Sequence, residues 1–158
     1  MRTRLLFSVL FLTVLITDQV SKLAVNVAFN VHDSRQIIGN LVRLTYIRNK
    51  GAAFGLKFGD PNVMFIITVL VTLFLLYLFL SGKINPGNVI GKCALVMIIG
   101  GAIGNLIDRI RMGEVIDFID MGIGNYRWPV YNLADVYITV GMFILIFFNV
   151  FSQKSSEA

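Results

Sequence analysis

The chain has 158 residues and a formal net charge of +5, and 56% of its residues are hydrophobic whereas only 15% are charged. With a mean hydropathy of +0.77, this composition excludes an ordinary soluble domain and indicates an integral membrane protein. We expect basic residues near a bilayer to contact anionic lipid head groups. No Gly-rich phosphate loop or aromatic RNA-binding pattern is present, so we expect no nucleic-acid partner.

Four apolar segments approach the length that crosses a bilayer, which is about 20 residues at about 1.5 Å each. A chain of 158 residues with four such segments has room for one helical bundle, so we expect a single integral membrane domain over residues 1–158. Its extracytoplasmic loops are expected at about residues 30–61 and 109–132. The spans are expected at about residues 5–28, 62–81, 89–108 and 133–152.

The first apolar segment has the basic start of a cleavable signal peptide. However, no Ala-x-Ala-like site follows the apolar run, and the polar stretch from Asp18 to Lys22 comes next. We therefore expect a retained helix. Alternation of four spans then puts both long loops, the ends of the first and third spans and the start of the fourth on one side of the membrane. Every acidic residue except Glu157 falls there.

The orientation of the chain is less clear from charge. Arg2 and Arg4 precede the first span, but more basic residues fall in the two long loops. Because the first helix usually dominates the positive-inside rule, we expect the N-terminus inside.

Elimination narrows the possible chemistry. His32 is the only histidine and Cys93 the only cysteine, so a His-rich metal site and an intrachain disulfide are excluded. A Ser-His-Asp site would have to use His32, which lies in a polar loop. We expect no metal and no cofactor; the remaining polar residues near the membrane are aspartate, asparagine, lysine and arginine.

Several of these residues pair at helical spacing. Asp18 and Lys22 stand four residues apart on one helix face, in the favourable acid-to-base order, and a structural role is as compatible with this as a catalytic one. Asn105, Asp108 and Arg109 also share a helix face. They follow a glycine run in which Gly100 and Gly104 form a small-xxx-small pair, which lets another helix approach closely.

Three aspartates, Asp117, Asp120 and Asp135, lie in or before the start of the fourth span. Asn132 and Asp135 have the spacing of a helix N-cap with an acidic partner, so capping alone could explain both. If the stretch GEVIDFID (113–120) is extended, alternation puts Asp117 and Asp120 on opposite faces, and only one of them can meet Asp135. Two carboxylates in a poorly hydrated pocket share one proton, which gives a general base and a general acid.

These motifs resemble the bacterial lipoprotein signal peptidases, also called signal peptidase II, over nearly the whole chain. The segments DQVSK (18–22), NKGAAFG (49–55), GGAIGNLIDR (100–109), GEVIDFID (113–120) and YNLAD (131–135) follow in the family's order. The resemblance implies an all-α membrane protein with four transmembrane helices and a small extracytoplasmic β-rich cradle, which suits the alternating segment LVRLTYIR (41–48). It also implies a multi-pass protein of the bacterial cytoplasmic (inner) membrane, with cytoplasmic termini and the active site near the outer face.

The activity that the resemblance implies is intramembrane aspartic endopeptidase cleavage of prolipoproteins, just before the diacylglyceryl-modified cysteine. The partners are then such prolipoproteins and membrane lipid, and we expect a monomer. By resemblance, the two catalytic residues are Asp117 and Asp135. The substrate-binding positions are Asn49, Gly51, Asn105, Arg109 and Asn132, and the supporting positions are Asp18, Lys22 and Asp108. The role of Asp120 stays open.

The polar cluster also fits roles that involve no proteolysis. Its members could merely satisfy one another between helices, although charge at membrane depth is costly and marks functional sites. A proton-coupled membrane transporter would use Asp18, Asp108 and Asp135 as a relay, but a relay should reach both faces and the inner halves of the spans are apolar apart from Lys92. A lipid-modifying transferase is a further alternative.

Overall fold

Helices form most of the computed structural model, which describes residues 1–53, 56–57, 61–82 and 89–154. Parts of the predicted first loop (54–55 and 58–60), the predicted connection between the second and third spans (83–88) and the tail (155–158) lie outside the described residues. The described elements are α1 (Arg2–Ala28), β1 (Ser34–Ile38), β2 (Val42–Asn49), β3 (Ala52–Ala53), β4 (Leu56–Lys57), α2 (Pro61–Leu80), α3 (Val89–Met112), β5 (Val115–Ile123), β6 (Tyr126–Arg127) and α4 (Leu133–Lys154).

Three of the helices are long and apolar enough to cross a membrane, namely α1, α2 from Asn62 to Leu80, and α3. In α4 the described apolar part, Leu133–Phe147, is shorter. Helix α2 leaves large apolar side chains such as Leu70 and Phe74 exposed on the protein surface, as expected of a helix that faces lipid. The fold is therefore that of a multi-pass membrane protein, and the fourth span stays a prediction.

Helix α3 extends beyond the expected third span. The span is expected at about residues 89–108, and the helix runs to Met112. Gly113 ends it with a φ of 73°, and the Gly113 N–H donates to the Arg109 carbonyl at 2.9 Å, as in a left-handed C-terminal cap. Arg109 and Arg111 in the last turn also complement the helix dipole. Arg109 is thus presented by a helix and not by a loop.

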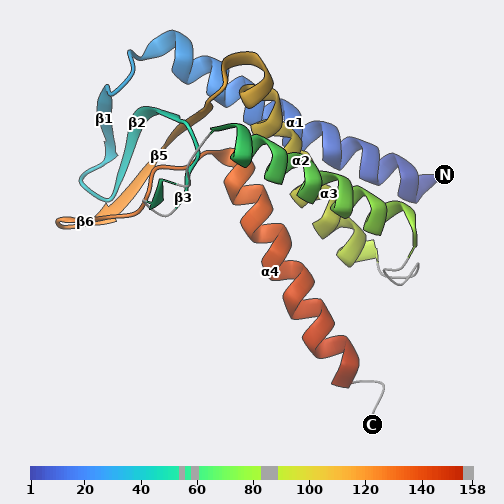
Figure 1. The fold of residues 1–158 in the computed structure, drawn as a ribbon. Helices are drawn as coiled ribbons and strands as arrows, with labels where there is room; N and C mark the ends of the chain where they lie inside the picture. Colours follow the sequence, from blue (N-terminus) through green and yellow to red (C-terminus); the bar gives the residue numbers. More distant parts are fainter. Residues whose placement is uncertain (54–55, 58–60, 83–88, 155–158) are drawn as a thin grey trace.

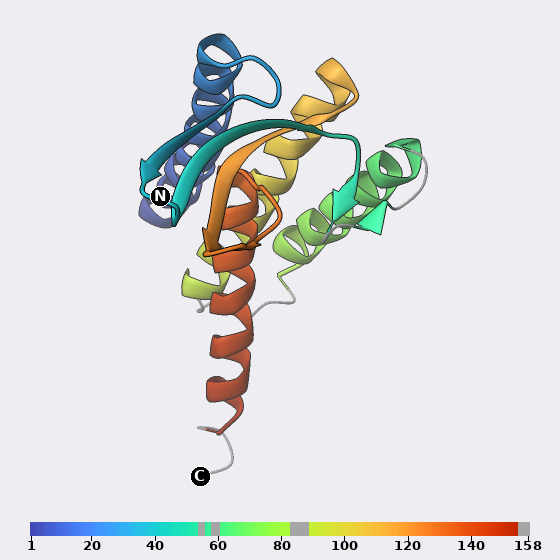
Figure 2. The ribbon, with the colours of Figure 1, turned by 90° about the vertical axis from the view of Figure 1, so that its left-hand side faces the viewer.

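A four-stranded antiparallel sheet with the order β1-β2-β5-β6 lies at one end of the helices (Figure 1). Both predicted extended segments are strands, since LVRLTYIR falls largely in β2 and GEVIDFID in β5. Figure 2 shows β2 arching across this end of the bundle. The register places Ile47 opposite Asp117 and Arg43 opposite Asp120, with a bulge in β2 between Leu44 and Ile47. The start of α1 and the end of α4 lie away from the sheet (Figure 1).

Glycines bring α1 and α4 close to α3. A Cβ at Gly100 would meet Val14 of α1, and one at Gly104 would overlap the carboxylate of Asp18. On another side of α3, a Cβ at Gly101 would meet the backbone of α4. The close approach predicted from the glycine run is therefore confirmed. It draws the polar ends of three helices together beneath the sheet.

A small apolar core attaches the sheet to α1. Val25 of α1 packs with Tyr46 of β2 and with Ile116 and Phe118 of β5. The Tyr46 hydroxyl, inside this core, donates to Asn26 Oδ1 at 2.6 Å, so its polar atom is satisfied. This packing fixes β5, and with it Asp117, over the ends of α1 and α3.

Candidate active site

A cavity of ≈ 890 Å³ lies between the sheet and the start of α4. Its polar lining includes Asn49 at the end of β2, Arg109 on α3, Asp117 on β5 and Asp135 in the first turn of α4. The rest is mostly apolar and comes from Leu41, the end of β5, the segment 128–131 and α4. Two carboxylates from different elements therefore face one space with predominantly apolar walls, as the sequence predicts.

Asp117 is almost fully buried, with 3% of its surface exposed. Its Oδ2 accepts a hydrogen bond from Asn49 Nδ2 at 2.9 Å, and its Oδ1 accepts one from Asn132 Nδ2 at 2.7 Å. Burial, and next the charge of Asp135, raise the pKa of Asp117 to about 7, although the two amides oppose this rise. Near neutral pH this carboxyl group therefore holds a proton in a large part of the molecules.

Asp135 both caps α4 and faces the cavity. The Asp135 N–H donates to Asn132 Oδ1 at 3.0 Å, and the Asn132 N–H donates to Asp135 Oδ2 at 3.2 Å. This reciprocal pair is the predicted capping arrangement. The Asp135 carboxylate accepts a second hydrogen bond at Oδ1, from Asn105 Nδ2 at 2.9 Å. Capping and exposure to the cavity are therefore compatible, because Asp135 is half-buried.

Two buried amides connect the carboxylates from behind the cavity. Besides its bond to Asp117, Asn132 Nδ2 lies within hydrogen-bond distance of Asn105 Oδ1 at 3.1 Å and of the Ile116 carbonyl at 3.2 Å. Asn132 is fully buried and Asn105 nearly so, and neither lines the cavity. The structure thus surrounds both predicted substrate-binding amides with protein groups and makes them the link between Asp117 and Asp135.

Gly51 also lies behind the cavity wall. Its N–H donates to Asn49 Oδ1 at 2.8 Å, which turns Asn49 Nδ2 toward Asp117. The residue has a φ of 122°, and a Cβ there would meet the Met64 side chain. A side chain at this position would therefore be strained in backbone and in packing, and glycine is required to hold Asn49 in place.

The three predicted supporting residues form one buried charge cluster. Lys22 Nζ lies 2.9 Å from Asp18 Oδ2, 2.9 Å from Asp108 Oδ2 and 2.9 Å from Asn105 Oδ1. Asp18 Oδ1 accepts the Ala134 N–H at 3.0 Å, at the start of α4. The cluster joins α1, α3 and α4, and through Asn105 it contacts Asp135.

Gln19 belongs to this cluster, although the sequence alone predicts no role for it. Its Nε2 lies 3.1 Å from Asp18 Oδ2, 3.1 Å from the Gly104 carbonyl and 3.2 Å from Asp108 Oδ1. The only sequence signal is its place inside the DQVSK motif, because a glutamine at membrane depth needs partners.

Arg109, the next residue after Asp108 on α3, does not belong to the charge cluster around Lys22. It lines the cavity with both carboxylates, but its guanidinium group makes no hydrogen bond or ion pair with another residue in the described part of the chain. Its guanidinium group presents several donors. Of the five predicted substrate-binding residues, Arg109 and Asn49 are the two that line the cavity.

The single histidine lies away from this site. His32 is exposed in the turn before β1 and does not line the cavity. Among residues 1–53, 56–57, 61–82 and 89–154, no three or more His, Cys, Asp or Glu side chains gather in a group that could hold a metal ion.

Solved structures define the class of protein. The chain is similar to a bacterial membrane enzyme solved by the in meso method, with a TM-score of 0.82, 34% sequence identity and coverage of 96% of this chain and 91% of that chain. A second bacterial membrane enzyme solved by the same method gives a TM-score of 0.77 at 35% identity, with coverage of 89% and 90%. The fold is thus that of a bacterial membrane enzyme.

Sequence comparisons identify the family. Residues 10–151 match the family model described as Signal peptidase (SPase) II. The lipoprotein signal peptidase of Syntrophus aciditrophicus (strain SB) is 40% identical over 147 residues, or 91% of each chain. That of Moorella thermoacetica is 43% identical over 139 residues, covering 88% of this chain and 89% of the relative, and that of Staphylococcus aureus (strain JH9) is 38% identical over 133 residues, covering 84% and 80%.

The chain therefore belongs to the signal peptidase II family. The resemblance found in the sequence motifs is confirmed over most of the chain. Membership places the protein among membrane proteases, and not among transporters or lipid-modifying transferases.

Proposed function

We propose that the protein is an aspartic endopeptidase that removes signal peptides from prolipoproteins, cleaving just before the diacylglyceryl-modified cysteine. The observation that carries the proposal is that Asp117 and Asp135 line one mostly apolar cavity at the end of the membrane helices. Relatives named lipoprotein signal peptidases, similar over most of the chain, support the choice of substrate.

The unequal surroundings of the two aspartates suggest their roles. Asp117 holds the proton, because its pKa is raised to about 7, and Asp135 is the base. Asp135 takes a proton from a water molecule whose oxygen attacks the scissile carbonyl carbon, while Asp117 donates its proton to the carbonyl oxygen. When the C–N bond breaks, Asp135 gives its proton to the leaving nitrogen and Asp117 recovers a proton from the tetrahedral hydroxyl group. No covalent intermediate is formed.

The other cavity groups hold the substrate for this reaction. The Arg109 guanidinium group, which has no hydrogen-bonding partner among the described residues, donates to backbone carbonyl groups of the substrate, and Asn49 supplies a polar group beside Asp117. Asn105 and Asn132 keep the two carboxylates at a fixed separation, since positioning supplies much of the reduction of the barrier. The apolar lining from α4 includes the exposed Val140, and in this proposal the lipid chains of the substrate stay in the bilayer beside it.

The same proposal includes the topology. All four helices span the cytoplasmic membrane within one domain over residues 1–158, the termini are cytoplasmic, and the cavity lies near the outer face of a monomer. The start of α1 and the end of α4 lie away from the sheet (Figure 1), and Arg2 and Arg4 mark the inner end of α1.

The test is product analysis. Purified protein in detergent micelles is incubated with a lipidated prolipoprotein, with and without a chelator, and the masses of the products are measured by mass spectrometry. We expect a signal peptide that ends at the residue before the lipidated cysteine, the same yield with chelator, and no cleavage of an unlipidated copy. Cleavage elsewhere, or of both substrates equally, would refute the proposed specificity.

A further inference from the structure

The strand that carries Asp117 also carries a second buried carboxylate, Asp120, whose role the sequence leaves open. Only 6% of Asp120 is exposed, and its partners lie away from the cavity. Its Oδ1 lies 2.6 Å from Arg127 Nε, and its Oδ2 accepts a hydrogen bond from Thr45 Oγ1 at 2.8 Å. The predicted alternation is confirmed, because Asp117 lines the cavity and Asp120 does not.

Arg127 uses the rest of its guanidinium group to join neighbouring segments. Nη2 donates to the Asp120 carbonyl at 2.9 Å, and Nη1 donates to the Asn40 carbonyl in the turn between β1 and β2 at 2.8 Å. The Gly122 N–H reaches the Leu41 carbonyl of the same turn at 3.0 Å. A charged group with this many fixed acceptors in a mostly buried setting holds its geometry well. The pair therefore ties β5, β6 and the β1–β2 turn together.

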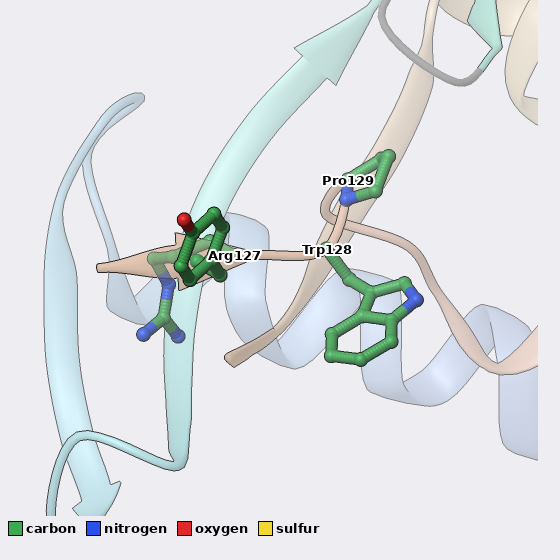
Figure 3. Close-up of a pocket in the computed structure, with 4 residues that line it drawn as sticks. Arg127, Trp128 and Pro129 are labelled. Carbon is green, nitrogen blue, oxygen red and sulfur yellow. The ribbon is translucent and has the colours of Figure 1, made fainter. Parts of the chain in front are cut away.

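The segment that follows Arg127 forms a wall of the cavity. Residues 128–131 all line it, and they lead directly to Asn132 and Asp135. The start of this segment also borders a second hollow of ≈ 380 Å³ lined by Tyr126, Arg127, Trp128 and Pro129 (Figure 3). In Figure 3 the side chain of Arg127 points away from that of Trp128.

Packing contributes little to holding the start of this wall. Trp128 is 63% exposed and Tyr126 is 85% exposed, so neither ring is enclosed by other side chains. The Trp128 N–H donates to the Met121 carbonyl at 2.8 Å.

The β5–β6 ladder also holds the backbone just before the wall, with Gly122 opposite Arg127, and at the far end of the wall Tyr131 exchanges backbone hydrogen bonds with Ile119. The side chain that ties the start of the wall to the sheet is Arg127, through Asp120 and the Asn40 carbonyl. The position of the start of the wall therefore depends in part on the Asp120–Arg127 pair.

We infer that Asp120 is a positioning residue which, through Arg127, sets the place of the 128–131 wall and thereby the affinity of the cavity for the substrate chain. Asp120 does not line the cavity and takes no part in proton transfer. This inference rests on the proposed function. It goes further by giving a carboxylate outside the dyad a role in substrate binding that is separate from catalysis.

Kinetics separate this role from a catalytic one. Asp120→Asn and Arg127→Gln are compared with wild type on a lipidated prolipoprotein in detergent micelles. We expect KM to rise by about five- to tenfold while kcat stays within about twofold. Because both substitutions break the same interaction, the KM of the double variant should not exceed that of the single variant with the higher KM. The control is Glu114→Gln, which removes a carboxylate that pairs loosely with the exposed Lys50 at 3.5 Å and should leave both constants unchanged.

The position of the wall can be measured directly, because Trp128 is the only tryptophan in the chain. We expect its emission maximum and its quenching by acrylamide to change in Asp120→Asn and Arg127→Gln but not in Glu114→Gln. If a variant does not fold, Thr45→Val removes a single hydrogen bond to Asp120 and should shift KM and quenching in the same direction by a smaller amount.

Two results would overturn the inference. One is an unchanged KM with unchanged Trp128 fluorescence in folded variants, and the other is a fall of kcat with KM unaltered. A wild-type protein that cleaves no prolipoprotein would refute the proposed function instead, and the fluorescence of Trp128 would still show whether Asp120 positions the wall.

Discussion

Asp117 and Asp135 carry the same functional group in different surroundings. Asp117 is enclosed on a strand, between Asn49 and Asn132, whereas Asp135 is half-buried in the first turn of a helix, where backbone and amide N–H groups reach both of its oxygens. Burial favours the neutral form of a carboxyl group, and N–H donors favour the ionised form. In the proposed mechanism, this difference lets Asp117 serve as the acid and Asp135 as the base.

The rate of cleavage should follow the protonation of Asp117. Because its pKa is raised to about 7, the proton is in place below that pH and is lost as the pH rises through it. We expect kcat to fall on the alkaline side, about tenfold per pH unit once the proton is gone. The measurement is a pH–rate profile over a range in which the wild-type fold is stable by circular dichroism. A flat profile between about pH 6 and about pH 9 would contradict the assignment of Asp117 as the acid.

Among the secondary-structure elements, α3 has the central place. Its glycines admit α1 on one side and α4 on another, and its C-terminal half carries Asn105, Asp108 and Arg109. The charge cluster around Lys22 closes the contact between α1 and α3. Burying these charges is tolerable because they are paired, and removing one leaves the others without compensation.

Lys22→Met should therefore destabilise the bundle strongly. The substitution keeps much of the volume but leaves Asp18 and Asp108 buried without their cation, which we expect to cost about 3–5 kcal/mol of unfolding free energy. Unfolding by a denaturing detergent, followed by circular dichroism, measures the loss.

The matched control is Lys50→Met, since the Lys50 side chain is 75% exposed and lies 3.5 Å from Glu114. We expect this change to cost less than about 1 kcal/mol. Equal unfolding free energies of the two variants would contradict the prediction that the buried cluster stabilises the bundle.

At the scale of the whole molecule, polar groups gather at one end. The sheet lies where α1 and α3 end and where α4 begins (Figures 1 and 2). Residues from the same ends of these helices line the cavity and form the charge cluster. The opposite end of the described bundle consists of the start of α1, the end of α2, the start of α3 and the end of α4. The proposed function therefore places cleavage at one surface of the membrane.

Cysteine labelling tests which surface that is. After Cys93→Ala removes the single native cysteine, Tyr126→Cys places a thiol beside the sheet and Ser81→Cys places one after α2, both at exposed positions. We expect a membrane-impermeant maleimide to label Tyr126→Cys in intact spheroplasts and Ser81→Cys only after lysis. The reverse pattern would invert the proposed topology.

Much of this fold could be predicted from local patterns in the sequence. Long apolar runs predict helices α1, α2 and α3, alternation predicts β2 and β5, and the Asn132–Asp135 spacing predicts the cap of α4. These features depend on neighbours along the chain. The two aspartates could be selected because their motifs match a family, since alternation alone left Asp117 and Asp120 equivalent.

Contacts between distant elements could not be predicted in this way. Asn49 reaches Asp117 because a bulge between Leu44 and Ile47 resets the faces of β2, and no simple alternation includes that extra residue. Likewise, Arg127 meets Asp120 because a tight turn at Gly124, with a φ of 59°, folds β6 back on β5. Register and helix rotation determine such contacts, and neither follows from periodicity.

The most direct test of the account is the loss of cleavage when either member of the dyad becomes an amide. Asp117→Asn and Asp135→Asn are assayed on a lipidated prolipoprotein beside Asp33→Asn, the same change at an exposed turn on the sheet side of the protein. With all three folded to the wild-type extent by circular dichroism, we expect the first two to lose at least about 10³-fold in kcat and the third to cleave normally. Normal cleavage by Asp117→Asn or Asp135→Asn would contradict the proposal that these two residues form the catalytic pair.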